Sequence, residues 1–68
     1  MSLAIALEQE DDGRWIAEID ELDGVLVYGE TREEAIKNVK TLALRVIADR
    51  LEHGENLPSQ VDSIFQAA

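Results

Sequence analysis

The chain has 68 residues, so we expect a single domain over residues 1–68, whose one small core needs a further source of stability. Because there is no cysteine, disulfides and thiolate metal sites are excluded, and the one histidine, His53, cannot build a metal site alone. No cofactor is expected, and oligomerisation into a homodimer is the source of stability that remains. The net charge of −9 argues against nucleic-acid binding, which relies on lysine and arginine, and it suits either a basic protein partner or simple solubility.

Two segments near the N-terminus alternate in hydropathy as half-buried strands do. Residues 2–8 and 15–19 each place alternate apolar side chains on one face, namely Leu3, Ile5 and Leu7 in the first segment and Trp15, Ala17 and Ile19 in the second. Pairing these sets on one face requires a three-residue loop at residues 11–13, with Gly13 at the position that needs a positive φ. In this register Leu7 lies opposite Ala17.

The third predicted strand covers residues 25–29, in which Val25 and Val27 continue the core face. The same register places Gly29 opposite Trp15. Because a glycine leaves space for a neighbouring ring, we interpret Gly29 as room for the indole, and Trp15 as a packing residue at the end of the sheet.

The opposite face of this predicted sheet is too apolar to be an ordinary solvent-exposed surface. It carries Ile16, Leu26 and Tyr28, and Glu18 lies at its edge. We predict that these four residues contact a partner protein.

The longest periodic segment, residues 31–53, predicts one amphipathic helix. Thr31 is suited to cap the first free amides, while Glu34 reaches back to the N–H group of the cap residue. Gly54 suits the left-handed position just after the helix. The stripe expected to face the core consists of Ala35, Val39, Leu42, Ala43 and Val46.

A second apolar stripe on the same helix contains Leu44, Ile47 and Leu51. It lies either under the C-terminal segment of the same chain or in a subunit contact. These three residues are therefore the second candidate surface for partner binding.

After the helix, residues 61–66 predict a short fourth strand with Ile64 or Phe65 entering the core. A right-handed crossover would place this strand beside the first one, in the sheet order 3-2-1-4, unless it is exchanged between subunits. The predicted fold is α+β: a three-stranded antiparallel meander, one long helix on one face and a short fourth strand, in the order β-β-β-α-β.

Several short motifs over residues 11–59 occur together in the order of one known family. They are the DG turn, the strand WIAEI, the loop ELDG, the helix start GET with EEA, and the closing GENLP. In this combination the chain resembles the HicB-type antitoxins. Asp20 and Asp23 stand where that family usually carries prolines. Family antitoxins also usually add a C-terminal DNA-binding module, which these 68 residues lack, so we expect no operator binding by this chain alone.

The resemblance implies a partial ribonuclease H-like fold, usually dimeric, that binds and masks a small basic mRNA endonuclease of the HicA type. Two alternatives are a freestanding dimeric module with another role, and a Mg²⁺-dependent enzyme that uses Glu8 and Glu18. We do not expect this protein to be an enzyme, because these two carboxylates flank Ile16 and Ala6 rather than further acidic residues.

The first eight residues are apolar but lack a basic start, and they run directly into the acidic residues EQEDD. This pattern predicts neither a signal peptide nor a membrane span. We therefore expect a cytoplasmic protein without a membrane partner.

Overall fold

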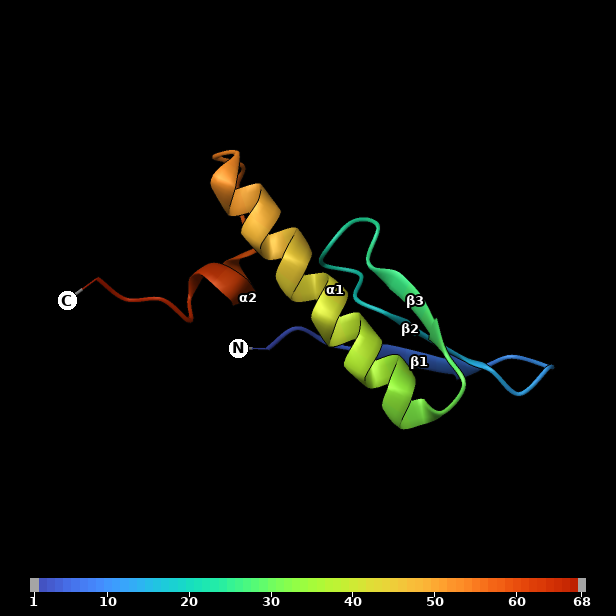
Figure 1. The fold of residues 1–68 in the computed structure, drawn as a ribbon. Coiled ribbons are helices and arrows are strands. Elements are labelled where there is room, and N and C mark those ends of the chain that lie inside the picture. Colours follow the sequence, from blue (N-terminus) through green and yellow to red (C-terminus); the bar gives the residue numbers. More distant parts are fainter. Residues whose placement is uncertain (1, 68) are drawn as a thin grey trace.

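The computed structural model describes residues 2–67, in which three antiparallel strands form a sheet and a long helix crosses one of its faces (Figure 1). The elements are β1 (Ala6–Gln9), β2 (Trp15–Glu18), β3 (Leu26–Gly29), α1 (Arg32–Glu52) and α2 (Ser59–Asp62). The strand order is β1-β2-β3, and α1 packs against β2 and β3. The α+β meander with one long helix on one face is confirmed.

The register of the sheet is the one that the alternation predicts. Leu7 pairs with Ala17, and Trp15 pairs with Gly29. In the loop at residues 11–13, Gly13 has a φ of 91° and its N–H group donates to the carbonyl of Glu10 at 2.9 Å. The first strand is shorter than predicted, because β1 begins at Ala6 rather than at residue 2.

The atoms nearest to a Cβ placed at Gly29 belong to Ala35 of α1 rather than to the Trp15 indole, so the interpretation of Gly29 as space for the indole stays a prediction. The first turn of α1 comes so close to β3 that a Cβ at Gly29 would clash with the backbone nitrogen of Ala35 and lie 2.7 Å from its Cα. Carbon atoms in van der Waals contact are about 3.5–4.0 Å apart, so this approach leaves no space for a side chain. Glycine at this position therefore allows the helix to pack on the sheet.

Both ends of α1 are specified by local hydrogen bonds. The hydroxyl of Thr31 accepts from the N–H group of Glu34 at 3.0 Å, as predicted. The Glu34 carboxylate accepts from the N–H group of Glu30 at 2.9 Å, one residue before the predicted partner. At the other end, Gly54 has a φ of 69°, and its N–H group donates to the carbonyl of Leu51 in a Schellman arrangement.

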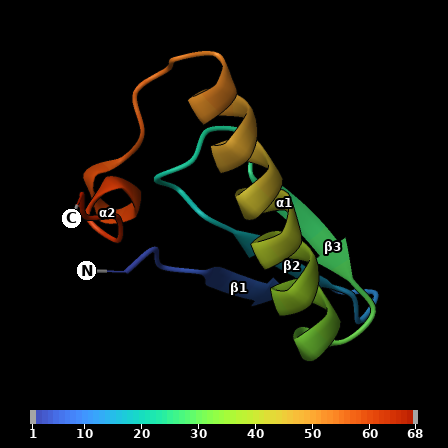
Figure 2. The same cartoon turned by 60° about the vertical axis from the view of Figure 1, so that its left-hand side comes forward.

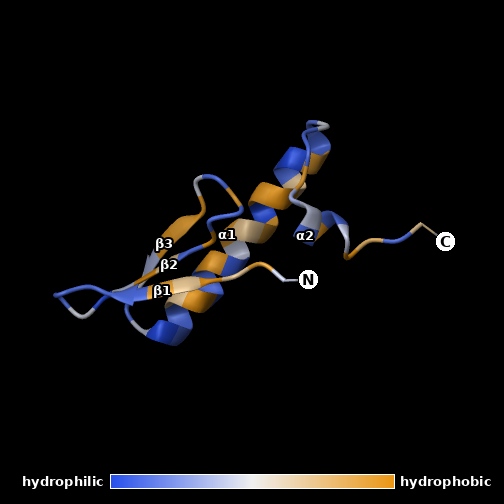
Figure 3. Cartoon of the chain, turned by 180° about the vertical axis from the view of Figure 1, so that it is seen from behind, coloured by the Kyte–Doolittle hydropathy of each residue, from blue (hydrophilic) through white to orange (hydrophobic). Residues whose placement is uncertain are grey.

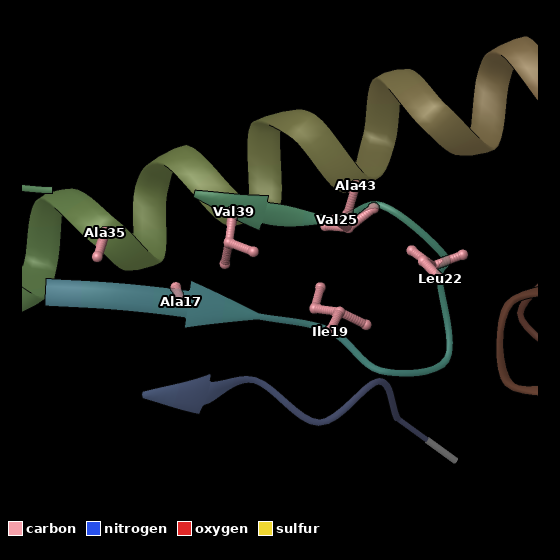
Figure 4. Close-up of a cluster of buried hydrophobic side chains, with 7 residues drawn as sticks. All are labelled: Ala17, Ile19, Leu22, Val25, Ala35, Val39 and Ala43. Atoms are coloured by element: carbon pink, nitrogen blue, oxygen red, sulfur yellow. The ribbon is translucent and has the colours of Figure 1, made fainter. Parts of the chain in front are cut away.

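The hydrophobic core lies between the sheet and α1 (Figure 4). From the predicted helix stripe, Ala35, Val39 and Ala43 are buried, while Leu42 and Val46 are partly buried against them. The sheet and the loop between β2 and β3 contribute the other buried members, namely Ala17, Ile19, Leu22 and Val25.

The predicted fourth strand at residues 61–66 is wrong, and so is the sheet order 3-2-1-4. After Pro58 the chain turns into the short helix α2, because the N–H groups of Val61 and Asp62 both donate to the Pro58 carbonyl at 3.0 Å. Local hydrogen bonds of this kind use the backbone groups that a strand would need for pairing. Val61 is the buried residue of this segment, whereas Ile64 and Phe65 are 67% and 62% exposed rather than in the core.

The second helix stripe is not covered by the C-terminal segment, contrary to one of the two expectations for it. Leu44 and Leu51 are 67% and 58% exposed, while Ile47 is half-buried against the core. The other expectation, a subunit contact, stays a prediction. Figures 1 and 2 show α2 set to the side of α1 near the N-terminal segment.

Candidate interaction surface

The face of the sheet opposite α1 forms a continuous surface, which we call the open sheet face. Cross-strand pairing fixes its rows. Ile16 lies between Glu8 and Tyr28, and Glu18 lies between Ala6 and Leu26. Neighbours of this kind have Cβ atoms about 5 Å apart, so side chains in one row touch each other. The open sheet face thus consists of Ala6, Glu8, Ile16, Glu18, Leu26 and Tyr28.

Large apolar side chains remain accessible on this face. Leu26 and Tyr28 are 45% and 46% exposed, and Ile16 between the outer strands is half-buried. Figure 3 shows the apolar residues along β3. The structure brings together all four residues that the sequence placed here, with an apolar centre and the carboxylate of Glu18 beside it.

The loop between β1 and β2 adds one cation to the open sheet face. The guanidinium of Arg14 lies 4.8 Å from the centre of the Tyr28 ring, within cation–π distance. Its Nε also donates to a carboxylate oxygen of Asp12 at 2.9 Å. Hydrogen bonds from the backbone N–H group and the side chain of Arg14 lower the pKa of Asp12. Because Asp12 balances Arg14, the charge of this surface comes from Glu8 and Glu18.

A second surface lies on the other side of the sheet, where Leu44 and Ile47 line a groove of about 320 Å³ between the N-terminal segment and α1. We call it the apolar groove. Leu51, from the same predicted stripe, does not line it. The complete lining is Leu3, Ile5, Ile19, Lys40, Ala43, Leu44 and Ile47.

Sequence reasoning found the open sheet face but missed the apolar groove. The groove depends on how residues 2–5 approach the helix, and no local pattern specifies that approach. One signal was present: the apolar arc of residues 31–53 is wider than a one-sided helix needs and includes Lys40.

The arrangement of acidic side chains does not resemble a catalytic carboxylate pair. Glu8 and Glu18 share the open sheet face, but Glu8 pairs across the sheet with Ile16 and Glu18 pairs with Ala6. Within residues 2–67, no three histidine, aspartate or glutamate side chains are close enough together to hold a metal ion.

In the part of the chain that the structure describes, no helix has the length and apolar character needed to cross a membrane.

Comparison with known proteins gives one informative similarity. The chain is 26% identical over 58 residues to UPF0150 protein Ta0767 of Thermoplasma acidophilum, and the match covers 85% of this chain and 84% of that protein. No protein-family model and no solved structure matches the chain. The similarity thus extends over nearly the whole of both proteins, from the sheet through the long helix.

Proposed function

We propose that this protein is an interaction module that binds and masks a small basic protein, as a HicB-type antitoxin silences an mRNA endonuclease of the HicA type. The observation that carries the proposal is the open sheet face, where exposed Leu26 and Tyr28 lie beside the carboxylate of Glu18. An apolar centre with a charged rim is the usual composition of a protein interface. The motifs over residues 11–59 support the choice of partner.

In this proposal the apolar and acidic residues have different tasks. A tyrosine in an interface supplies affinity, because its large ring is removed from water when the partner binds. The carboxylates of Glu8 and Glu18, together with the net charge of −9, attract a basic partner and speed its association. Masking of the partner's active surface requires no chemistry from this chain, so the proposal assigns it no enzymatic activity.

The proposed inhibitor is a homodimer that acts in the cytoplasm, where mRNA is the substrate of its partner. Dimerisation supplies the stability that a core of this size lacks, since binding between copies adds to the free energy of unfolding. Leu44 and Ile47 of α1, which line the apolar groove, remain for this subunit contact, because the open sheet face is used for the partner.

The test is a titration of RNA cleavage by the product of the neighbouring reading frame. We expect that product to be a small basic endonuclease, and this protein to abolish cleavage at a stoichiometric ratio. Tyr28→Asp should raise the concentration needed for half-inhibition by ~30-fold or more, as for an interface hot spot. Leu51→Asp is the control, because it places the same charge on an apolar residue of similar exposure on α1.

Two results would contradict the proposal. The first is a neighbouring protein that is not basic or does not bind, which would favour a freestanding dimeric module with another role. The second is RNA cleavage by this protein itself in the presence of Mg²⁺, lost in Glu8→Gln or Glu18→Gln, which would favour the enzyme alternative.

A further inference from the structure

The apolar groove is an open surface with one charged residue in its lining. Leu44 at its rim is 67% exposed, and Leu3 and Ile5 form its other side. Lys40 is the charged residue, so the groove is free of acidic side chains in a chain of net charge −9. The groove lies beside β1, which is an edge strand of the sheet. The lack of acidic side chains distinguishes this groove from the open sheet face, which carries Glu8 and Glu18.

The C-terminal segment offers apolar side chains without a place to bury them. Ile64 and Phe65 follow α2 directly and are 67% and 62% exposed. In Figures 1 and 3 residues 63–67 lead away from the sheet and α1. Val61, by contrast, is only 3% exposed, so α2 is held against the domain while the segment after it projects outward.

We propose that the apolar groove is the receptor for Ile64 and Phe65 of a second copy of this chain, and that the exchange is reciprocal. The inference rests on the proposed homodimer and is independent of the toxin partner. In a two-fold dimer each copy offers the same surfaces, so one tail and one groove per copy are sufficient to close the assembly.

Charge selects this contact over others between two acidic copies. Two chains that each carry a net charge of −9 repel each other, and like charges placed across an interface weaken it. Residues 59–67 carry a single charged side chain, Asp62, and the groove carries Lys40. Contact between tail and groove therefore joins a weakly acidic segment to a surface with a positive charge, and keeps the acidic regions apart.

The required interface area also favours a reciprocal exchange. A phenylalanine buries ~150–250 Å² and a stable interface buries roughly 1,200–2,000 Å² in total, so a single tail in a single groove is too small. Two tails and two grooves double the area and add the exposed parts of α1 around Leu44.

Sedimentation equilibrium of the full chain and three variants tests the site. The wild type should be a dimer at micromolar concentration. Phe65→Asp and Leu44→Asp should each raise the dimer dissociation constant by ~30-fold or more. Leu51→Asp should keep the dimer dissociation constant within about threefold of the wild-type value, since Leu51 is exposed on the same helix but does not line the groove. A monomeric wild type, or a Leu51→Asp variant that dissociates while Phe65→Asp does not, would overturn the proposal.

Disulfide trapping distinguishes exchange from a tail that folds back into its own groove. The wild type contains no cysteine, so introduced pairs report cleanly. The double variant Leu44→Cys, Phe65→Cys should give a covalent dimer on oxidation, and a mixture of the two single variants should give a disulfide between different chains. Leu51→Cys paired with Phe65→Cys is the control that should cross-link more slowly. A covalently closed monomer from the Leu44→Cys, Phe65→Cys variant would overturn the exchange and assign the tail to its own groove.

Discussion

The guanidinium of Arg14 lies over the ring of Tyr28, 4.8 Å from its centre, so a cation borders the aromatic residue that the edge strand β3 places on the open sheet face. Arg14 also donates to Asp12 at 2.9 Å, which holds the guanidinium in this position. A basic partner that approaches Tyr28 meets this positive charge on one side and the carboxylate of Glu18 on the other. The two residues should therefore affect association in opposite directions.

Charge reversal at Glu18 should slow association of the basic partner. We expect Glu18→Lys to lower the association rate constant at low salt and to have less effect at high salt, because exposed charges are screened. Arg14→Gln should raise the same rate constant. Stopped-flow binding at two ionic strengths measures both. Glu52→Lys on α1 is the matched control for Glu18→Lys, and Arg50→Gln on α1 is the matched control for Arg14→Gln. Each control should change the association rate constant less than the variant that it matches. Equal effects of the matched variants would show that only net charge matters.

The close approach of Gly29 to Ala35 predicts a large cost for any side chain at this position. Gly29→Ala should lower the free energy of unfolding by ~1–3 kcal/mol through overpacking. Urea unfolding at one fixed protein concentration measures this change. Trp15→Ala in the same chain distinguishes the two explanations of the glycine. If the clash with Ala35 causes the loss, adding Trp15→Ala to Gly29→Ala should not recover the free energy of unfolding. Recovery would support the interpretation that Gly29 makes room for the indole.

The N-cap of α1 should contribute measurably to stability. Thr31→Ala removes the acceptor of the Glu34 N–H group and should cost about 1 kcal/mol. Thr41→Ala is the matched control, because the Thr41 hydroxyl bonds the Lys37 carbonyl within the helix, and alanine is the better helix former there. We expect this control to be neutral or stabilising in urea unfolding. A Thr41→Ala variant as unstable as Thr31→Ala would contradict the role of the cap.

The single histidine should make stability depend on pH in a defined direction. Nδ1 of His53 lies 2.7 Å from the Asp49 carbonyl, and this hydrogen bond, with the negative charge of Asp49, raises the pKa of His53 above 6.5. A raised pKa in the folded state means that the stabilising contribution is fully present below pH 6.5 and is lost as the pH rises through the folded value.

Unfolding of the wild type and of His53→Gln should therefore differ more at about pH 5.5 than at about pH 8.5. Measuring both proteins at each pH removes the effect of all other titrating groups. A difference that stays constant, or widens as the pH rises, would show that protonated His53 has no favourable interaction at the end of α1.

Local patterns predicted most of the fold. The alternation of residues 15–19 and the glycine at position 13 set the register, and α1 begins and ends within one residue of the predicted limits. The fourth strand failed because residues 61–66 are too short for alternation to outweigh the local hydrogen bonds after Pro58. The open sheet face was predictable, since it follows from register alone. The apolar groove depends on how residues 2–5 approach α1, and the wide apolar arc of the helix is its one local signal. The packing of Ala35 on Gly29 depends on how closely α1 approaches the sheet, which no local pattern specifies.

The dissociation rate of the complex with the basic partner tests the proposed use of the open sheet face most directly. Truncation of a large aromatic residue in an interface acts mainly on dissociation, so Tyr28→Ala should speed dissociation of the partner by ~30-fold or more. Leu51→Ala and Leu44→Ala on α1 should leave the rate within about threefold. If instead Tyr28→Ala dissociates like the wild type while the two α1 variants dissociate faster, the partner binds the helix and the open sheet face is not the inhibitory surface.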